Sequence, residues 1–259
     1  MKNNKVITMV TIIAVIAIAG TFFGVNHLID TYVNQQRASQ SGNQASVSGQ
    51  AAAGQAVSPA YGMIMVTMDA PEESGVCGET LEWYYKDEVL VITGTGEMDE
   101  YIPFADDAPW DSLKSQIGCV ILDEGVMSIG GAAFQDCVNM TEIVLPLYLT
   151  YIDDNAFFGC SSLLQIELPD GVIGIGESAF EGCSSLRNIV IPDGVTSIGD
   201  RAFSYCSKLR KIILPDSVTR IDKETFFGCI NLQKIVIPDG ITSIGDYAFC
   251  SCGMMEITI

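Results

Sequence analysis

A 23-residue unit recurs six times between residue 120 and the end of the chain, and this period constrains the fold more than any other feature. The fourth unit, IVIPDGVTSIGDRAFSYCSKLRK, shows the full pattern. Repetition at a period of about 20–50 residues is the signature of a solenoid, in which each unit contacts only its neighbours. The units begin at Val120, Ile143, Ile166, Ile189, Ile212 and Ile235; the sixth is one residue short, and Ile257-Thr258-Ile259 opens a seventh.

Each position of the unit has a structural interpretation. Ile189 and Ile191 alternate with an outward residue, as in a short strand. The Pro-Asp-Gly at 192–194 predicts a turn, because proline presets φ and glycine supplies a positive φ. The remaining apolar positions, Phe203 and Cys206 among them, face inward, and stacked coils bury them with strands about 4.8 Å apart. The sequence therefore predicts a strand-rich repeat solenoid whose strands are joined by short turns or 3₁₀ segments.

The repeat also carries a recognisable family pattern. Leu209-x-x-Ile212-x-Leu214 is the LxxLxL spacing of a leucine-rich repeat. The motif IPDGVTSIGxxAFxxCxxL, with Cys77-Gly78, LEWYYKDEVLVITGTGEM at 81–98 and Ala108-Pro109-Trp110 upstream, resembles the BspA-like (Treponema-type) leucine-rich repeat family over residues 77–259. The resemblance implies a right-handed leucine-rich repeat superhelix. It also implies a surface-exposed interaction or adhesion protein with no catalytic residues to carry over, whose partner is an extracellular protein or glycan.

Residues 77–119 are predicted to form an N-terminal β cap on the repeats at 120–259. Alternating apolar residues on both sides of a polar turn predict a β-hairpin within 81–93. A hairpin carrying Trp83, together with Trp110, can cover the otherwise exposed core of the first coil.

Residues 1–29 are predicted to be a transmembrane signal anchor, with a cleaved signal peptide as the alternative. Residues 6–25 are uncharged, and twenty helical residues span about 30 Å, the thickness of a bilayer core. Lys2 and Lys5 precede this segment and place the N-terminus in the cytoplasm. Residues 30–73, rich in Gln, Ser, Ala and Gly, are predicted to be a flexible linker. The expected location is the cell membrane, single-pass, with the C-terminal domain extracellular; cleavage after Ala17-Ile18-Ala19 would instead release a secreted protein.

Composition excludes several function classes. A net charge of −19 argues against nucleic acid as a partner. The single histidine, His27, precedes the repeats, which removes Ser-His-Asp and Cys-His catalysis and histidine-ligated metals from the repeat region. Acidic pairs such as Asp153-Asp154 do not have the spacing of a calcium loop. We therefore expect no enzyme, no metal and no cofactor; the alternatives are a carboxylate-dependent glycan hydrolase and a passive structural spacer of the cell envelope.

Six of the nine cysteines occupy one repeat position: Cys137, Cys160, Cys183, Cys206, Cys229 and Cys252. Neighbouring coils would place their α-carbons about 5 Å apart, within reach of a disulfide. A disulfide ladder could pair only alternate neighbours, however, whereas the position is identical in all six units. Buried thiols acting as small apolar side chains are the favoured interpretation, with a metal–thiolate ladder as the alternative. A disulfide between Cys250 and Cys252, or between Cys77 and Cys119, stays open.

Positive charge is concentrated in one part of the repeats. Beyond residue 60 there are 10 Lys and Arg against 31 Asp and Glu, and eight of the ten bases fall in residues 187–234 beside only five acids. Several of these bases immediately precede strands, at the margin of the predicted concave face, and the second strand residues should point outward beside them. The predicted ligand-contact patch comprises Arg187, Val190, Arg210, Lys211, Ile213 and Lys234. Such a patch suits an anionic protein or glycan; drift among repeats without a function is the alternative, and the oligomeric state is left open.

Overall fold

The computed structural model describes residues 71–102, 107–253 and 256–258. The predicted membrane segment at 1–29 and the linker as far as residue 70 lie outside the described residues. Within the described part of the chain, no helix has the length and apolar character needed to cross a membrane. All of the described residues belong to one compact unit, Ala70–Ile259.

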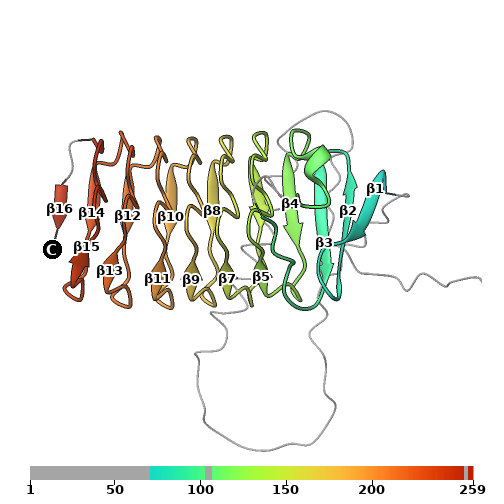
Figure 1. Cartoon of the computed structure of the whole chain (residues 1–259), viewed down its shortest axis with the longest axis horizontal. Helices are drawn as coiled ribbons and strands as arrows, with labels where there is room; N and C mark the ends of the chain where they lie inside the picture. Colours follow the sequence, from blue (N-terminus) through green and yellow to red (C-terminus); the bar gives the residue numbers. More distant parts are fainter. Residues whose placement is uncertain (1–70, 103–106, 254–255, 259) are drawn as a thin grey trace, which may run out of the picture. The chain divides into compact units, whose positions relative to one another are not determined.

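The repeats form coils stacked side by side, each contributing two short parallel strands (Figure 1). The first strands are β4 (Cys119–Leu122), β6 (Glu142–Val144), β8 (Gln165–Glu167), β10 (Asn188–Val190), β12 (Lys211–Ile213), β14 (Lys234–Val236) and β16 (Glu256–Thr258). The second strands are β5 (Ser128–Ile129), β7 (Tyr151–Ile152), β9 (Gly174–Ile175), β11 (Ser197–Ile198), β13 (Arg220–Ile221) and β15 (Ser243–Ile244). We call the surface made by β4, β6, β8, β10, β12, β14 and β16 the strand face. The strand-rich solenoid predicted from the repeat is confirmed, whereas its handedness stays a prediction.

The part of each coil opposite the strand face, which we call the turn side, consists of turns rather than 3₁₀ helix. Its backbone is bonded from coil to coil: the N–H groups of Arg201, Phe203 and Tyr205 donate to carbonyls of the next coil at 2.7–2.9 Å. Arg201 and Tyr205 both adopt a φ of +57°. Equivalent residues on either side of the phenylalanine have a positive φ in the neighbouring coils as well. These left-handed residues turn the N–H groups toward the next coil.

The Pro-Asp-Gly segments do form turns, but not with the predicted glycine conformation. In the fourth coil the Val195 N–H donates to the Pro192 carbonyl at 3.1 Å, closing a four-residue turn. Gly194 is absent from the residues with a positive φ, so the prediction that this glycine supplies one is wrong. A turn of this kind can be made without a positive φ. A Cβ on Gly194 would instead lie only 3.2 Å from the Asp170 carbonyl of the preceding coil, so the small residue provides space.

A column of stacked phenylalanines forms the centre of the core. The five rings are fully buried and lie nearly parallel, with neighbouring ring centroids 5.2–5.8 Å apart. They belong to Phe134, Phe157, Phe180, Phe203 and Phe226, and Phe249 continues the stack. A single coil could not bury its own phenylalanine ring, because the rings of the neighbouring coils cover it. The stability of each coil therefore depends on its neighbours.

The repeat cysteines line the core beside the phenylalanines. Five of the six are buried and Cys252 is half-buried; all nine cysteines of the chain lie among the described residues and are free thiols. From Cys160 onward, each repeat thiol donates to the phenylalanine carbonyl of the preceding coil at 3.0–3.2 Å. Burial raises the pKa of Cys229 to about 12 and that of Cys206 well above its usual range. The prediction of buried thiols is confirmed for these five, and neither of the two optional disulfides is present.

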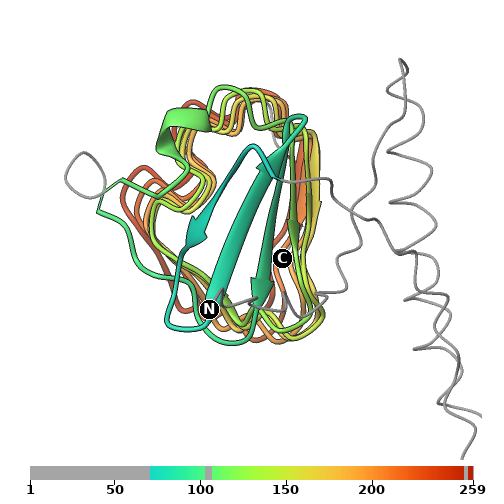
Figure 2. The same ribbon diagram turned by 90° about the vertical axis from the view of Figure 1, so that its right-hand side faces the viewer.

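The predicted hairpin is present at the N-terminal end of the stack. Figure 2 looks along the stack from this end, with the hairpin in front of the coils. β1 (Glu73–Val76), β2 (Leu81–Lys86) and β3 (Val89–Gly94) are antiparallel, and β3 pairs in parallel with β4. Trp110 stacks on Phe134 with ring centroids 5.7 Å apart, and its indole N–H donates to the Ala133 carbonyl at 2.8 Å. Trp83 meets Trp110 edge-on. These contacts cover the first coil; the role of 77–119 as a cap stays a prediction.

Candidate ligand-binding surface

The strand face presents two columns of outward side chains. Ile189 in the middle of β10 is buried, whereas its neighbour Val190 is 77% exposed; in β12, Ile212 is buried and Ile213 is 48% exposed. This is the alternation expected of a strand with one face on the core. The predicted outward apolar stripe is therefore confirmed at β10 and β12. Glu167 pairs in register with Val190 and interrupts the stripe at β8.

Three of the predicted patch bases lie together at the leading edge of these strands. Arg187 and Arg210 immediately precede β10 and β12, and the Arg210 N–H donates to the Arg187 carbonyl at 3.4 Å. Lys211 opens β12 and pairs in register with Asn188 of β10. All three side chains are exposed, and none forms an ion pair with another described residue. Their charges are therefore available to a ligand.

Lys234, the fourth predicted patch base, differs from the other three because it forms an ion pair. It is half-buried, and its Nζ lies 3.3 Å from Oε1 of Glu256 on the next strand of the face. This ion pair was not predicted from the sequence, because Glu256 is 22 residues away in the chain and comes close to Lys234 only when the coils stack. The structure therefore keeps Lys234 at the predicted position but partly neutralises its charge.

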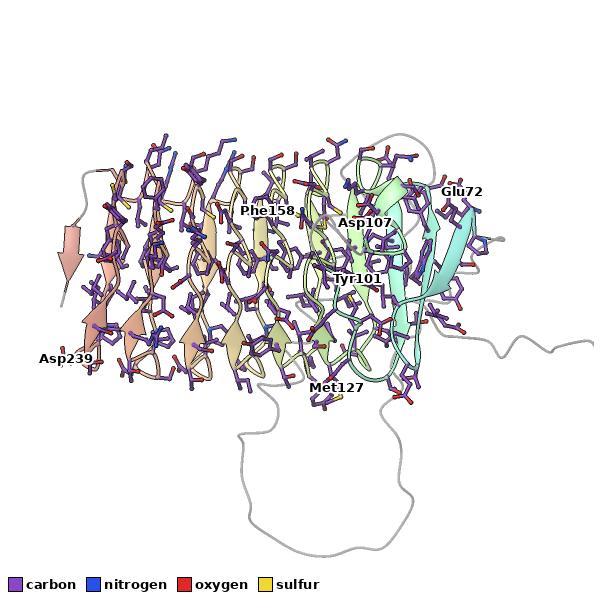
Figure 3. All side chains as sticks on the ribbon, viewed as in Figure 1. Glu72, Tyr101, Asp107, Met127, Phe158 and Asp239 are labelled. Atoms are coloured by element: carbon purple, nitrogen blue, oxygen red, sulfur yellow. The ribbon has the colours of Figure 1, made fainter. Side chains whose placement is uncertain are left out.

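The trailing edge of the strand face carries acids that sequence reasoning did not single out. The aspartates of the Pro-Asp-Gly turns are exposed, and Figure 3 shows Asp239 at the turn that follows β14. Asp193 and Asp216 follow β10 and β12, and neither forms an ion pair with another described residue. The repeated Pro-Asp motif could have indicated this row of acids, but its sequence interpretation concerned only turn formation. Each of the two strands thus runs from a base, across an apolar side chain, to an acid.

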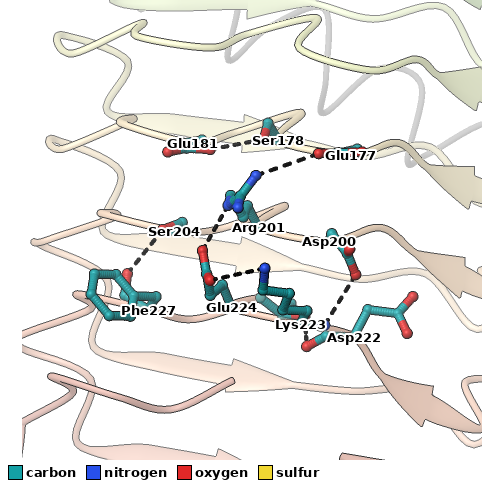
Figure 4. A network of polar contacts seen from close by, with 11 residues as sticks. Glu177, Ser178, Glu181, Asp200, Arg201, Ser204, Asp222, Lys223, Glu224 and Phe227 are labelled. Carbon is teal, nitrogen blue, oxygen red and sulfur yellow. Dashed lines mark hydrogen bonds and ion pairs between the residues drawn. The ribbon is translucent and has the colours of Figure 1, made fainter. Parts of the chain in front are cut away.

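The remaining bases of residues 187–234 belong mostly to the turn side (Figure 4). Arg201 Nε lies 2.7 Å from Glu224 Oε2, and its Nη1 lies 3.6 Å from Glu177 Oε1, so one side chain links three coils. Lys223 Nζ is 3.5 Å from Glu224 Oε1. Arg201 raises the stability of the charged carboxylate and holds the pKa of Glu224 below its usual range. Arg201 therefore acts between coils, whereas Lys223 pairs with an acid of its own coil.

The coils that carry the patch meet at a break in the strand pairing. β10 and β12 share a single register pair, Asn188 with Lys211, whereas β12 and β14 share three. The second strands β11 and β13 belong to different sheets. The turn-side bonds of Arg201 and Phe203 cross the same junction without interruption. Pairing within the strand face is thus reduced where its unpaired bases lie, although it is weaker still between β6 and β8, which belong to different sheets.

The arrangement offers unpaired charge, exposed apolar side chains and a flat backbone scaffold. Among residues 71–102, 107–253 and 256–258, no group of three or more His, Cys, Asp or Glu side chains is placed to hold a metal ion. A surface with an apolar centre and a charged margin is the usual composition of a macromolecular interface.

The sequence of residues 122–258 matches the family model for the BspA type leucine-rich repeat region, in six copies. The chain belongs to the BspA type leucine-rich repeat family. Leucine-rich repeat proteins are generally binding or scaffold proteins rather than enzymes, and their partners are generally proteins or glycans. The family prediction made from the repeat motif is therefore confirmed.

Two solved structures resemble this leucine-rich repeat protein. The Treponema pallidum leucine-rich repeat protein is 28% identical with a TM-score of 0.56; the match covers 71% of this chain and 87% of that one. A leucine-rich cell surface protein of Faecalibacterium prausnitzii is 31% identical with a TM-score of 0.56, and covers 74% of this chain and 55% of that one. No curated protein matches the chain in sequence.

Proposed function

We propose that this leucine-rich repeat protein is displayed at the cell surface and mediates adhesion by binding an anionic extracellular macromolecule on the strand face. The observation that carries the proposal is the group of three unpaired bases, Arg187, Arg210 and Lys211, beside exposed Val190 and Ile213. Neighbouring coils are about 4.8 Å apart, so these charges lie within one Debye length and act together.

The three unpaired bases lie on a protein that is otherwise strongly acidic. Beyond residue 60 the chain carries 31 acids against 10 bases, so most of its surface repels anions. An anionic partner is therefore steered toward the few places where bases are free. The apolar side chains beside them supply contact area that a purely electrostatic site would lack.

Membrane display is supported by the uncharged segment at 6–25 and the two lysines before it. An anchored protein keeps this segment and stays with membranes after a high-salt wash. N-terminal sequencing that finds Gly20 as the mature N-terminus would show cleavage and secretion instead.

The binding proposal is tested by reversing the charge of Arg210 and Lys211 together. The full chain, the Arg210→Glu/Lys211→Glu variant and a control are applied to an array of sulfated glycans and acidic peptides at increasing salt. The control, Lys86→Glu/Lys114→Glu, changes the net charge equally outside the repeats. We expect the array signal and its salt dependence to be lost only in the strand-face variant, with unchanged circular dichroism. Equal binding by all three proteins would refute the proposal.

A further inference from the structure

The charge of the strand face changes sign across its width, from basic at one edge to acidic at the other. This restricts the charge pattern of a partner, and not only its net charge. Along β10 and its flanks the exposed residues run from Arg187 through the uncharged Asn188 and apolar Val190 to Asp193. The next coil repeats the order base, apolar, acid at the equivalent places along β12. The basic edge and the acidic edge both lack ion-pair partners among the described residues. Two parallel edges of opposite charge therefore flank one apolar stripe.

The dimensions of this face suit a particular element. Asp193 lies six positions after Arg187, and a strand rises about 3.3 Å per residue, so the edges are at most roughly 20 Å apart. An α-helix with its side chains is about 10–12 Å across. Laid along the stack over Val190 and Ile213, it would extend long charged side chains over both edges. Its pitch of about 5.4 Å is close to the coil spacing of about 4.8 Å, so successive turns meet successive coils.

The stripe has a defined length. Glu167 lies beside Val190 and ends the apolar column on one side, while partly buried Val236 extends it beyond Ile213. On the same strand as Val236, Lys234 is already paired with Glu256 of β16. Three coils cover about 10 Å along the stack, which corresponds to about two helical turns.

We propose that the strand face over β10, β12 and β14 binds an amphipathic helix of a partner protein, with acidic side chains on one flank and basic side chains on the other. This inference rests on the proposed function and specifies its partner. A polyanionic glycan carries the same charge over both edges, so the exposed Asp193 and Asp216 oppose it. The helix pairs with both edges at once.

The test uses three synthetic helical peptides with an identical apolar stripe and different flanks. One has Glu on one flank and Lys on the other, one has Glu on both, and one has Lys on both; heparin serves as the glycan probe. Binding to the full chain is measured by fluorescence anisotropy at physiological salt. We expect the mixed peptide to bind at least about tenfold more tightly than either single-charge peptide or heparin, since each unmatched flank meets a like charge.

Charge-removing variants of the two edges give opposite predictions. Asp193→Asn/Asp216→Asn should weaken the mixed peptide several-fold and strengthen the peptide with Glu on both flanks. Arg187→Gln/Arg210→Gln should weaken the mixed peptide and strengthen the peptide with Lys on both flanks. Glu72→Gln/Glu73→Gln, at the start of β1 near the N-terminal end of the stack, has the same charge change as the aspartate variant and should alter neither.

The outcomes separate the two proposals. Equal affinity for all three peptides, or an aspartate variant that leaves the affinities of the mixed peptide and of the peptide with Glu on both flanks unchanged, overturns the inference. Heparin binding that is tighter than the mixed peptide and is lost in Arg210→Glu/Lys211→Glu overturns it as well, while the proposed function stands. Insensitivity of every array ligand to Arg210→Glu/Lys211→Glu removes the proposed function itself.

Discussion

The turn side and the strand face come from the same repeat but obey different constraints. At the phenylalanine position of the turn side, every coil from Phe134 to Phe249 has the same residue, because each ring packs between its two neighbours. At the outward position of the strand face, Glu167, Val190 and Ile213 succeed one another, because side chains at this position do not pack into the core. Uniform positions therefore report packing, and only variable ones can report a ligand.

The junction between the fourth and fifth coils shows the same division in its hydrogen bonds. The strand side keeps one register pair there, between Asn188 and Lys211, while the turn side keeps its complete set of inter-coil bonds. The Arg201 ion pairs reinforce the turn side at this place. The turn side thus joins the coils continuously at a place where the pairing of the strand face is reduced.

Thiol reactivity should distinguish the exposed surface of the turn side from its buried core most strongly, by orders of magnitude in rate. The thiolate is the reactive form, and burial raises the pKa of Cys229 to about 12, against about 8.5 for a free thiol. We expect exposed Cys250 to be labelled first and the five buried repeat thiols only after unfolding in urea. Because unfolded thiols ionise above about pH 8.5 while the buried ones stay protonated, stability should fall as pH rises beyond that value.

Mass spectrometry of the labelled peptides gives the measurement. Rapid labelling of Cys206 in the native protein, or its recovery in a disulfide, would contradict the buried-thiol column.

Truncation of the core ring should have the largest effect on stability. Phe203→Ala removes a fully buried ring from the middle of the stack and should lower the free energy of unfolding by about 3–5 kcal/mol through the cavity that it leaves. Val190→Ala on the strand face is the matched control and should change it by no more than about 0.5 kcal/mol. Urea denaturation followed by circular dichroism compares them; similar losses would mean that the strand face is also structural.

The smallest effect should distinguish a paired arginine from a free one. Arg201→Gln removes ion pairs with Glu177 and Glu224, whereas Arg210→Gln removes none, so only the first should lower the urea midpoint. The loss should be small and reduced by salt, because these groups are partly accessible to solvent.

Its pH dependence has a defined sign. Arg201 lowers the pKa of Glu224, so the stabilisation is present at neutral pH and disappears as pH falls through that lowered pKa. The Arg201→Gln variant should therefore match the unmodified protein at acidic pH. A difference that persists there would mean that Arg201 stabilises the coil through packing.

Much of the fold followed from the period and polarity of the repeat. A stack of coils leaves one place for Phe203 and Cys206, which is why their burial could be predicted. The outward direction of Val190 and Ile213 followed from strand alternation. Glycine conformation could not be obtained in this way: Gly194 has no positive φ, while Arg201 has one despite its side chain. Bonds between coils outweigh the local preference of a single residue.

The sequence by itself determined the solenoid, its core columns and the family, because all of these depend on which residue types recur every 23 positions. Only the tertiary structure decided which charges are free. Lys234 is paired and Lys211 is not, although both open a strand, because Glu256 happens to lie within reach of the first. The repeat determines where the backbone of such a residue lies. Its long side chain can reach either neighbouring coil, so the residues of those coils determine its contacts.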